Sequence, residues 1–130
     1  MAEGAEWVWV ADTSIRSTGM PDRAAAWQQI GHIYTTLKQP EQALDAYQQA
    51  AKFDPATALP WNSLGDVYRT LNRPDEAVKA YQRAIELDPA LAWPYHHLGE
   101  IYQEREEYHQ AVTYYRQAIE RHPAERERAP

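Results

Sequence analysis

The 130-residue chain contains no cysteine, which excludes disulfide bonds, thiolate zinc sites and cysteine nucleophiles. It has one phenylalanine, so the aromatic part of a core must come from its five tryptophans and nine tyrosines. No apolar run approaches the roughly 18 residues that a membrane span requires. Residues 1–10 carry two glutamates and no basic residue, and so lack the charged start and long apolar stretch of a signal peptide. We therefore expect a cytoplasmic protein with no membrane association.

The charge balance is acidic and has no basic cluster. Nineteen acidic and thirteen basic side chains give a formal net charge of −6, and no run of lysine or arginine interrupts it. Nucleic-acid binding needs a clustered basic face, so we expect no nucleic-acid partner. With 44% hydrophobic residues, the chain has enough apolar material for one compact domain or one short solenoid.

The chain repeats itself with a fixed period of 34 residues. Within residues 58–91 the repeated positions are Trp61, Leu64, Gly65, Tyr68, Ala77, Tyr81, Ala84 and Pro89. The earlier copy has Trp27, Ile30, Gly31, Tyr34, Ala43, Tyr47, Ala50 and Pro55, and the later copy has Tyr95, Leu98, Gly99, Tyr102, Ala111, Tyr115, Ala118 and Pro123. Six of the eight residue types are identical in all three copies. A period of this size indicates a stack of identical structural units.

Apolar residues at helical spacing predict two helices in each repeat. The first helices are expected near 24–37, 58–71 and 92–105, and the second near 40–53, 74–87 and 108–121. Pro40 and Pro74 begin two of the second helices, where the missing N–H costs nothing. Glycine recurs in the middle of each first helix, where it costs about 1 kcal/mol relative to alanine. We expect it there because a neighbouring helix must approach closely. The repeats are placed at 24–57, 58–91 and 92–125, with a tail at 126–130.

Residues 1–23 fit this period poorly. Pro21 has the phase of a repeat end, but Trp9, Thr13 and Arg16 stand where Ala, Tyr and Ala are expected. Three interpretations stay open: a degenerate capping helix packed on the first repeat, an extended arm, or a disordered leader. The cluster from Trp7 to Val10 could also dock on a neighbouring chain.

The repeated residues resemble the tetratricopeptide repeat, whose pattern is W-x2-L-G-x2-Y followed by A-x3-F/Y and a closing proline. The resemblance covers residues 24–125 and implies an all-α fold. That fold is a right-handed alpha-alpha superhelix, a TPR solenoid of three helix-turn-helix repeats, here with a short N-terminal segment. It also implies a concave groove, lined by the first helix of each repeat, that binds peptides. Lys38, Asn72 and Glu106 replace the usual turn glycine, and of these only Asn readily takes a left-handed conformation.

The first helices must turn one face to the core and the opposite face to the groove. That opposite face supplies the candidate ligand-binding residues: Gln28, Gln29, His32 and Thr35 in the first repeat, Asn62, Ser63, Asp66 and Arg69 in the second, and Trp93, His96, His97, Glu100 and Gln103 in the third. Amides can pair with a peptide backbone, and Trp93 has no evident core role. The alternative for any one of these residues is an ordinary solvated helix face.

Family members that grip the carboxylate of chaperone C-termini carry lysine, asparagine and arginine in this groove. The corresponding places here hold Gln28, His32, Ser63, Trp93 and His97, so the permanent cations are missing and this ligand is not expected. The acids in the groove favour a partner of basic or amide character.

No metal, cofactor or catalytic site is predicted. His32, Asp66 and Glu100 form a row across helices about 8–10 Å apart, too wide to converge on one ion. Ser63 and His97 have no orienting acid or nucleophile elbow beside them.

We therefore predict a non-enzymatic protein-protein interaction scaffold that binds a peptide or protein segment in the groove. The alternative is a structural or regulatory TPR segment of a larger protein whose activity lies elsewhere. Because residues 124–130 are too short for a capping helix, we expect Val112, Tyr115 and Ile119 to expose apolar surface. This end, or the N-terminal arm, could form a homo-oligomer.

Overall fold

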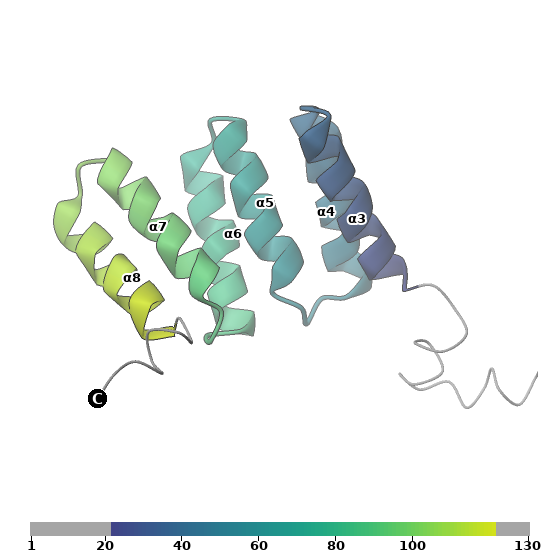
Figure 1. Ribbon diagram of the computed structural model, residues 1–130. Coiled ribbons are helices and arrows are strands. Elements are labelled where there is room, and N and C mark those ends of the chain that lie inside the picture. Colours follow the sequence, from purple (N-terminus) through teal and green to yellow (C-terminus); the bar gives the residue numbers. More distant parts are fainter. Residues whose placement is uncertain (1–21, 122–130) are drawn as a thin grey trace, which may run out of the picture.

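The computed structural model describes residues 22–121 (Figure 1). The predictions for the N-terminal capping helix or arm and for the tail at 126–130 lie outside the described residues. The part of the chain that the structure describes forms six helices: α3 (Arg23–Thr36), α4 (Pro40–Phe53), α5 (Leu59–Thr70), α6 (Pro74–Leu87), α7 (Ala92–Glu104) and α8 (Tyr108–Arg121). Each predicted helix is therefore present, with bounds that differ from the prediction by no more than one residue.

The helices form antiparallel pairs that stack in a row. In Figure 1, α3 pairs with α4, α5 with α6, and α7 with α8. Successive pairs contact one another through α4 with α5 and through α6 with α7. The result is an all-α superhelix in which each pair packs mainly on its immediate neighbours. None of these helices has both the length and the apolar character needed to cross a membrane.

The turn inside each pair closes with the same hydrogen bonds. After α3, the N–H of Lys38 donates to the carbonyl of Thr35, and the N–H of Gln39 donates to the carbonyl of Tyr34. The same two bonds follow α5 and α7. This Schellman geometry requires a left-handed residue after the helix. Lys38, Asn72 and Glu106 accordingly have φ of 60°, 62° and 64°. Asparagine takes this conformation readily, and the two closing bonds impose it on Lys38 and Glu106 as well.

Two core clusters are built from the same repeat positions. One contains Ala43 and Tyr47 from α4 with Leu64 and Val67 from α5. The other contains Ala77 and Tyr81 from α6 with Leu98 and Ile101 from α7. Each cluster therefore lies between one repeat and the next. The core that the repeated residues predicted is present, and it joins the repeats to one another.

Candidate functional site

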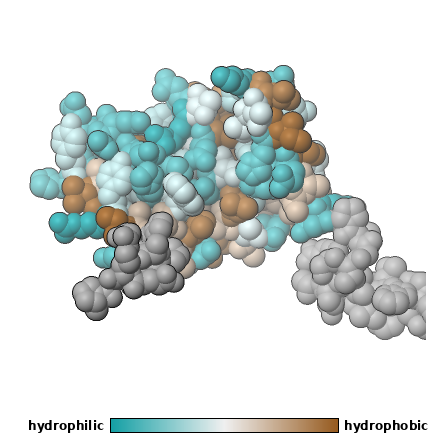
Figure 2. Space-filling view, in the orientation of Figure 1, coloured by the Kyte–Doolittle hydropathy of each residue, from teal (hydrophilic) through white to brown (hydrophobic). Residues whose placement is uncertain are grey.

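The candidate residues lie on α3, α5 and α7, on a surface that we call the groove face. Figure 2 shows one side of the molecule, largely hydrophilic, with hydrophobic atoms over the upper part of α3, over α8 and along the lower edge. The candidates differ in how much of the side chain solvent reaches. Exposed are Gln29, His32, Thr35, Asp66, Trp93 and Gln103; half-buried are Asn62, Arg69, His96, His97 and Glu100; buried are Gln28 and Ser63.

Gln28 and Ser63 link two helices. Gln28 is 6% exposed and Ser63 is 7% exposed, and the Nε2 of Gln28 donates to the Oγ of Ser63 over 2.9 Å. The sequence placed both side chains in the groove, free to meet a ligand. The structure corrects this, because both side chains are buried and hydrogen-bonded to each other across α3 and α5. Their hydrogen bond holds the two helices together and leaves little of either side chain for a partner.

Two amide oxygens on this side are buried without a protein partner. The Oε1 of Gln28 and the Oδ1 of Asn62 accept no hydrogen bond from residues 22–121. A buried acceptor without a partner costs free energy. Truncating Asn62 to alanine would therefore break no hydrogen bond from the described residues to its side-chain oxygen.

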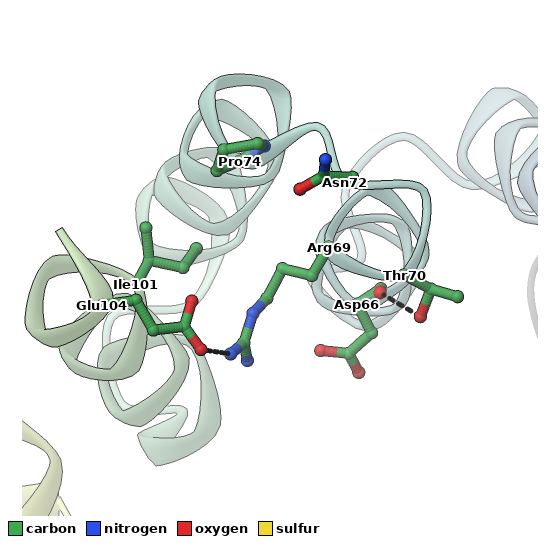
Figure 3. A pocket seen from close by; sticks show the side chains of 7 residues that line it. All are labelled: Asp66, Arg69, Thr70, Asn72, Pro74, Ile101 and Glu104. Atoms are coloured by element: carbon green, nitrogen blue, oxygen red, sulfur yellow. Dashed lines mark hydrogen bonds and ion pairs between the residues drawn. The ribbon is translucent and has the colours of Figure 1, made fainter.

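Arg69 joins the second repeat to the third. Its Nη1 lies 2.8 Å from the Oε1 of Glu100, and its Nη2 lies 3.1 Å from the Oε2 of Glu104. Figure 3 shows the guanidinium reaching from α5 to Glu104 on α7. Burial alone would lower the pKa of Arg69, but the hydrogen bond to Glu100 and the charges of Tyr81, Glu100 and Glu104 raise it overall. The arginine therefore stays charged and is already occupied by two carboxylates.

His97 connects the acids of α5 and α7. Its Nδ1 lies 3.2 Å from the Oε1 of Glu100, and its Nε2 lies 3.5 Å from the Oδ1 of Asp66. Burial alone would raise the pKa of Glu100, but hydrogen bonds from His97 and Arg69 lower it overall. Glu100 is thus an ionised carboxylate at neutral pH, and its charge is used within the protein.

An aromatic stack leads from the core to the surface of the third repeat. The Tyr81 and His97 rings are stacked with centroids 5.2 Å apart, and His97 stacks on Trp93 at 5.6 Å. His96 meets the edge of Trp93 at 5.8 Å. Trp93 at the outer end is 60% exposed. Its indole is therefore held in place from two sides while much of its surface faces solvent.

Sequence reasoning missed a second role for three core tyrosines. The hydroxyl of Tyr47 lies 3.0 Å from the Nδ1 of His32, that of Tyr81 donates to Asp66, and that of Tyr115 donates to the Oε1 of Gln103 over 2.8 Å. Burial raises the pKa of Tyr81 most, and the nearby Asp66 carboxylate raises it further. These bonds could have been predicted from the sequence, because the hydroxyl of a tyrosine in a core usually needs a hydrogen-bond partner.

Two cavities open between the groove helices. One of about 530 Å³ lies between α3 and α5 and is lined by residues that include His32, Tyr47, Val67 and Lys38. The other, of about 380 Å³, lies between α5 and α7 and is shown in Figure 3; Asp66, Arg69, Thr70, Asn72, Pro74, Ile101 and Glu104 line it. Both cavities are open and suit side chains of a bound segment better than an enclosed small molecule.

Among residues 22–121, no three His, Cys, Asp or Glu side chains are arranged to hold a metal ion. Ser63 is 7% exposed and its Oγ accepts the bond from Gln28, while the ring nitrogens of His97 lie near Asp66 and Glu100.

The sequence also matches models of known families. The TPR repeat model matches residues 31–72 and 65–105, and a second tetratricopeptide repeat model matches residues 95–127. The chain belongs to the tetratricopeptide repeat family. The resemblance drawn from the repeated residues is thereby confirmed. A search among curated proteins gave no significant match.

Solved structures contain the same tetratricopeptide fold. A crystal structure of MamA superposes with a TM-score of 0.76 at 25% sequence identity, covering 82% of this chain and 62% of that one. This chain therefore spans less than two thirds of that protein. The second TPR domain of Spaghetti (RPAP3), bound to the HSP90 peptide SRMEEVD, superposes with a TM-score of 0.73 at 19% identity, covering 77% of this chain and 93% of that one. At that identity the likeness shows the fold alone.

Proposed function

We propose that this chain is a protein-interaction scaffold that binds a peptide or protein segment along the groove face. The observation that carries the proposal is Trp93, which is 60% exposed on a helix whose tyrosines, Tyr95 and Tyr102, are buried and half-buried. A rigidly held, exposed tryptophan is a typical anchor of a binding surface, where it supplies large contact area at little entropic cost. The two open cavities between α3, α5 and α7 provide further places for side chains of the same segment.

The charges of the groove favour a basic or neutral segment. Between α5 and α7, Asp66, Glu100 and Glu104 outnumber the cation Arg69, which pairs with both glutamates, so carboxylates are in excess there. A guanidinium, an ammonium or an aromatic ring could pack on Trp93, since the faces of indole attract cations. We infer that an acidic C-terminal peptide is a poor ligand, because both terminal nitrogens of Arg69 are already paired with glutamates.

The proposal is tested in two steps with the full chain. Immobilised protein captures partners, and peptide mapping defines the bound segment. Calorimetric titration then compares the wild type with Trp93→Ala, Asn62→Ala and Phe53→Ala. Phe53 is an exposed aromatic at the end of α4 and serves as the matched control. Because anchor tryptophans contribute about 2 kcal/mol or more, Trp93→Ala should weaken binding about thirtyfold, with Phe53→Ala close to wild type. If neither Trp93→Ala nor Asn62→Ala reduces capture, the groove face is not the binding site.

A second titration checks the specificity. The peptide SRMEEVD serves as an acidic probe, and the mapped segment with each of its basic residues replaced by glutamine serves as a neutral one. The proposal expects no measurable binding of SRMEEVD and weaker binding of the neutral segment. Tight binding of SRMEEVD would contradict the inferred charge preference.

A further inference from the structure

The outer face of α3 is exposed at positions that the other repeats bury. Ile33 is 57% exposed, whereas the equivalent residues one and two repeats later, Val67 and Ile101, are 4% and 1% exposed. Leu37 is exposed as well, and its equivalent Leu71 is half-buried. In the second and third repeats, the preceding helix covers these positions. The exposed face of α3 is therefore one half of an inter-repeat contact.

The outer face of α8 is the other half. Val112 is 49% exposed and Ile119 is 56% exposed. Their equivalents in the second repeat, Val78 and Ile85, are half-buried because α7 packs beside them. Within residues 22–121 nothing covers α8 in this way. Figure 2 shows hydrophobic atoms at both of these ends of the row.

The two exposed faces match each other position by position. Both core clusters use an alanine and a tyrosine from a second helix and two aliphatic residues from the next first helix, and the first cluster adds Ala80 of α6. The third repeat already carries the alanine and the tyrosine, as Ala111 and Tyr115. The first repeat carries the aliphatic pair, as Ile30 and Ile33. We propose that α8 of one copy packs on α3 of a second copy, head to tail, with the geometry of α6 on α7.

The polar positions around this contact are also compatible. When the first repeat of the second copy follows the third repeat, the pair Arg69 and Glu100 becomes Gln103 and His32 of the second copy. The pair Asp75 and Arg105 becomes His109 and Leu37 of the second copy. Neither substitution brings like charges together, so these two pairs do not repel.

A second copy fits the α3 face better than the chain's own N-terminal residues do. A helix that covers α3 as α4 covers α5 would need alanine and tyrosine at positions 9 and 13. The sequence has Trp9 and Thr13 there, and the required pair occurs at Ala111 and Tyr115. The contact joins two different surfaces, so it leaves a free end on each copy and builds open chains instead of closed dimers. Such stacking also aligns the groove faces of successive copies.

Sedimentation velocity of the full chain tests the proposal. The mean mass should rise with protein concentration without levelling at a dimer. Ile33→Asp blocks the α3 end and Ile119→Asp blocks the α8 end, and both residues are exposed, so the fold should tolerate the changes. Each variant alone should stay monomeric, because its one open end meets a blocked end. An equal mixture should form a dimer and nothing larger, because the open α8 end of Ile33→Asp pairs with the open α3 end of Ile119→Asp and only blocked ends are left. Circular dichroism of both variants verifies that they are folded.

Three results would overturn the proposal. The wild type could remain a monomer up to millimolar concentration, which would mean that the ends do not associate or that residues 1–21 cover α3. One variant could still dimerise alone, which would mean a symmetric contact. The mixture could stay monomeric although the wild type associates.

A charge pair checks the register. Leu37→Arg combined with His109→Asp recreates the ion pair of Arg105 and Asp75 between copies, and should tighten association about two- to fivefold. Leu37→Arg combined with His109→Arg is the matched control and should weaken it. Equal affinities for the two double variants would show that these residues do not meet.

Discussion

The ring of Tyr81 occupies the space that a side chain at Gly65 would need. A Cβ placed on Gly65 would lie 2.5 Å from the Cε1 of Tyr81, whose side chain is fully buried. At Gly99 the corresponding distance, to the ring of Tyr115, is 2.9 Å, and Tyr115 is only half-buried. The glycine is therefore required more strictly in the second repeat, at Gly65, than in the third, at Gly99.

We expect Gly65→Ala to lower the free energy of unfolding by about 1–3 kcal/mol, although alanine gains about 1 kcal/mol in helix propensity. Gly99→Ala should cost clearly less, because the partly exposed Tyr115 ring can move aside. Urea denaturation of the two variants measures the difference. Equal losses at the two positions would show that burial of the tyrosine does not decide the effect.

Glycine at the left-handed turns should stabilise the protein. Lys38 and Glu106 have φ of 60° and 64°, a conformation that costs a residue with a Cβ about 1 kcal/mol. Lys38→Gly and Glu106→Gly should therefore each raise the free energy of unfolding by up to about 1 kcal/mol, reduced by the greater freedom of glycine in the unfolded chain. Asn72→Gly is the control and should change stability less, since asparagine tolerates this conformation. Thermal melting with calorimetry measures all three.

Ser63→Ala should destabilise the contact between the first two repeats. The buried Nε2 of Gln28 would lose its partner, at a cost of about 1–3 kcal/mol. Replacing both residues, as Gln28→Leu with Ser63→Ala, should recover most of that loss because no unpaired donor remains. Urea midpoints of the single and double variants test this coupling. A double variant as unstable as the single one would indicate that the hydrogen bond is not the cause.

Acid should weaken the protein partly through Glu100. Its folded-state pKa lies below the ordinary value of 4.5, since His97 and Arg69 stabilise the carboxylate against the opposing effect of burial. A group with a lowered folded pKa contributes stability above its unfolded pKa and loses that stability as pH falls through the folded pKa. Glu100→Gln should therefore be less stable than wild type at pH 7, and the difference should be below about 1 kcal/mol because this group is partly exposed. As the pH falls below 4.5, the variant should lose less stability than wild type does. Urea midpoints between neutral and acidic pH measure both effects; identical pH slopes would contradict the assignment.

The sequence by itself determined the helices and the architecture. The positions of Trp61, Gly65, Tyr68 and Ala77 recur at a fixed period, and helical spacing of apolar residues is a local property that can be recognised before folding. Three copies of one pattern also require that each copy packs on the next, because a single helix pair cannot bury its apolar face. The helix bounds and the stacked fold were predictable for this reason.

Tertiary structure decided which polar side chains the groove actually offers. Gln28 and Gln29 are adjacent in sequence and equally polar, yet one is buried against Ser63 and the other is exposed. Lys38 and Glu106 adopt a strained turn because, in each turn, two carbonyls at the helix end must receive hydrogen bonds. The availability of a side chain on the groove face depends on the helix that lies beside it, about 34 residues away in the sequence. A local pattern identifies the face of a helix, but only packing between repeats determines which residues on that face remain free to bind.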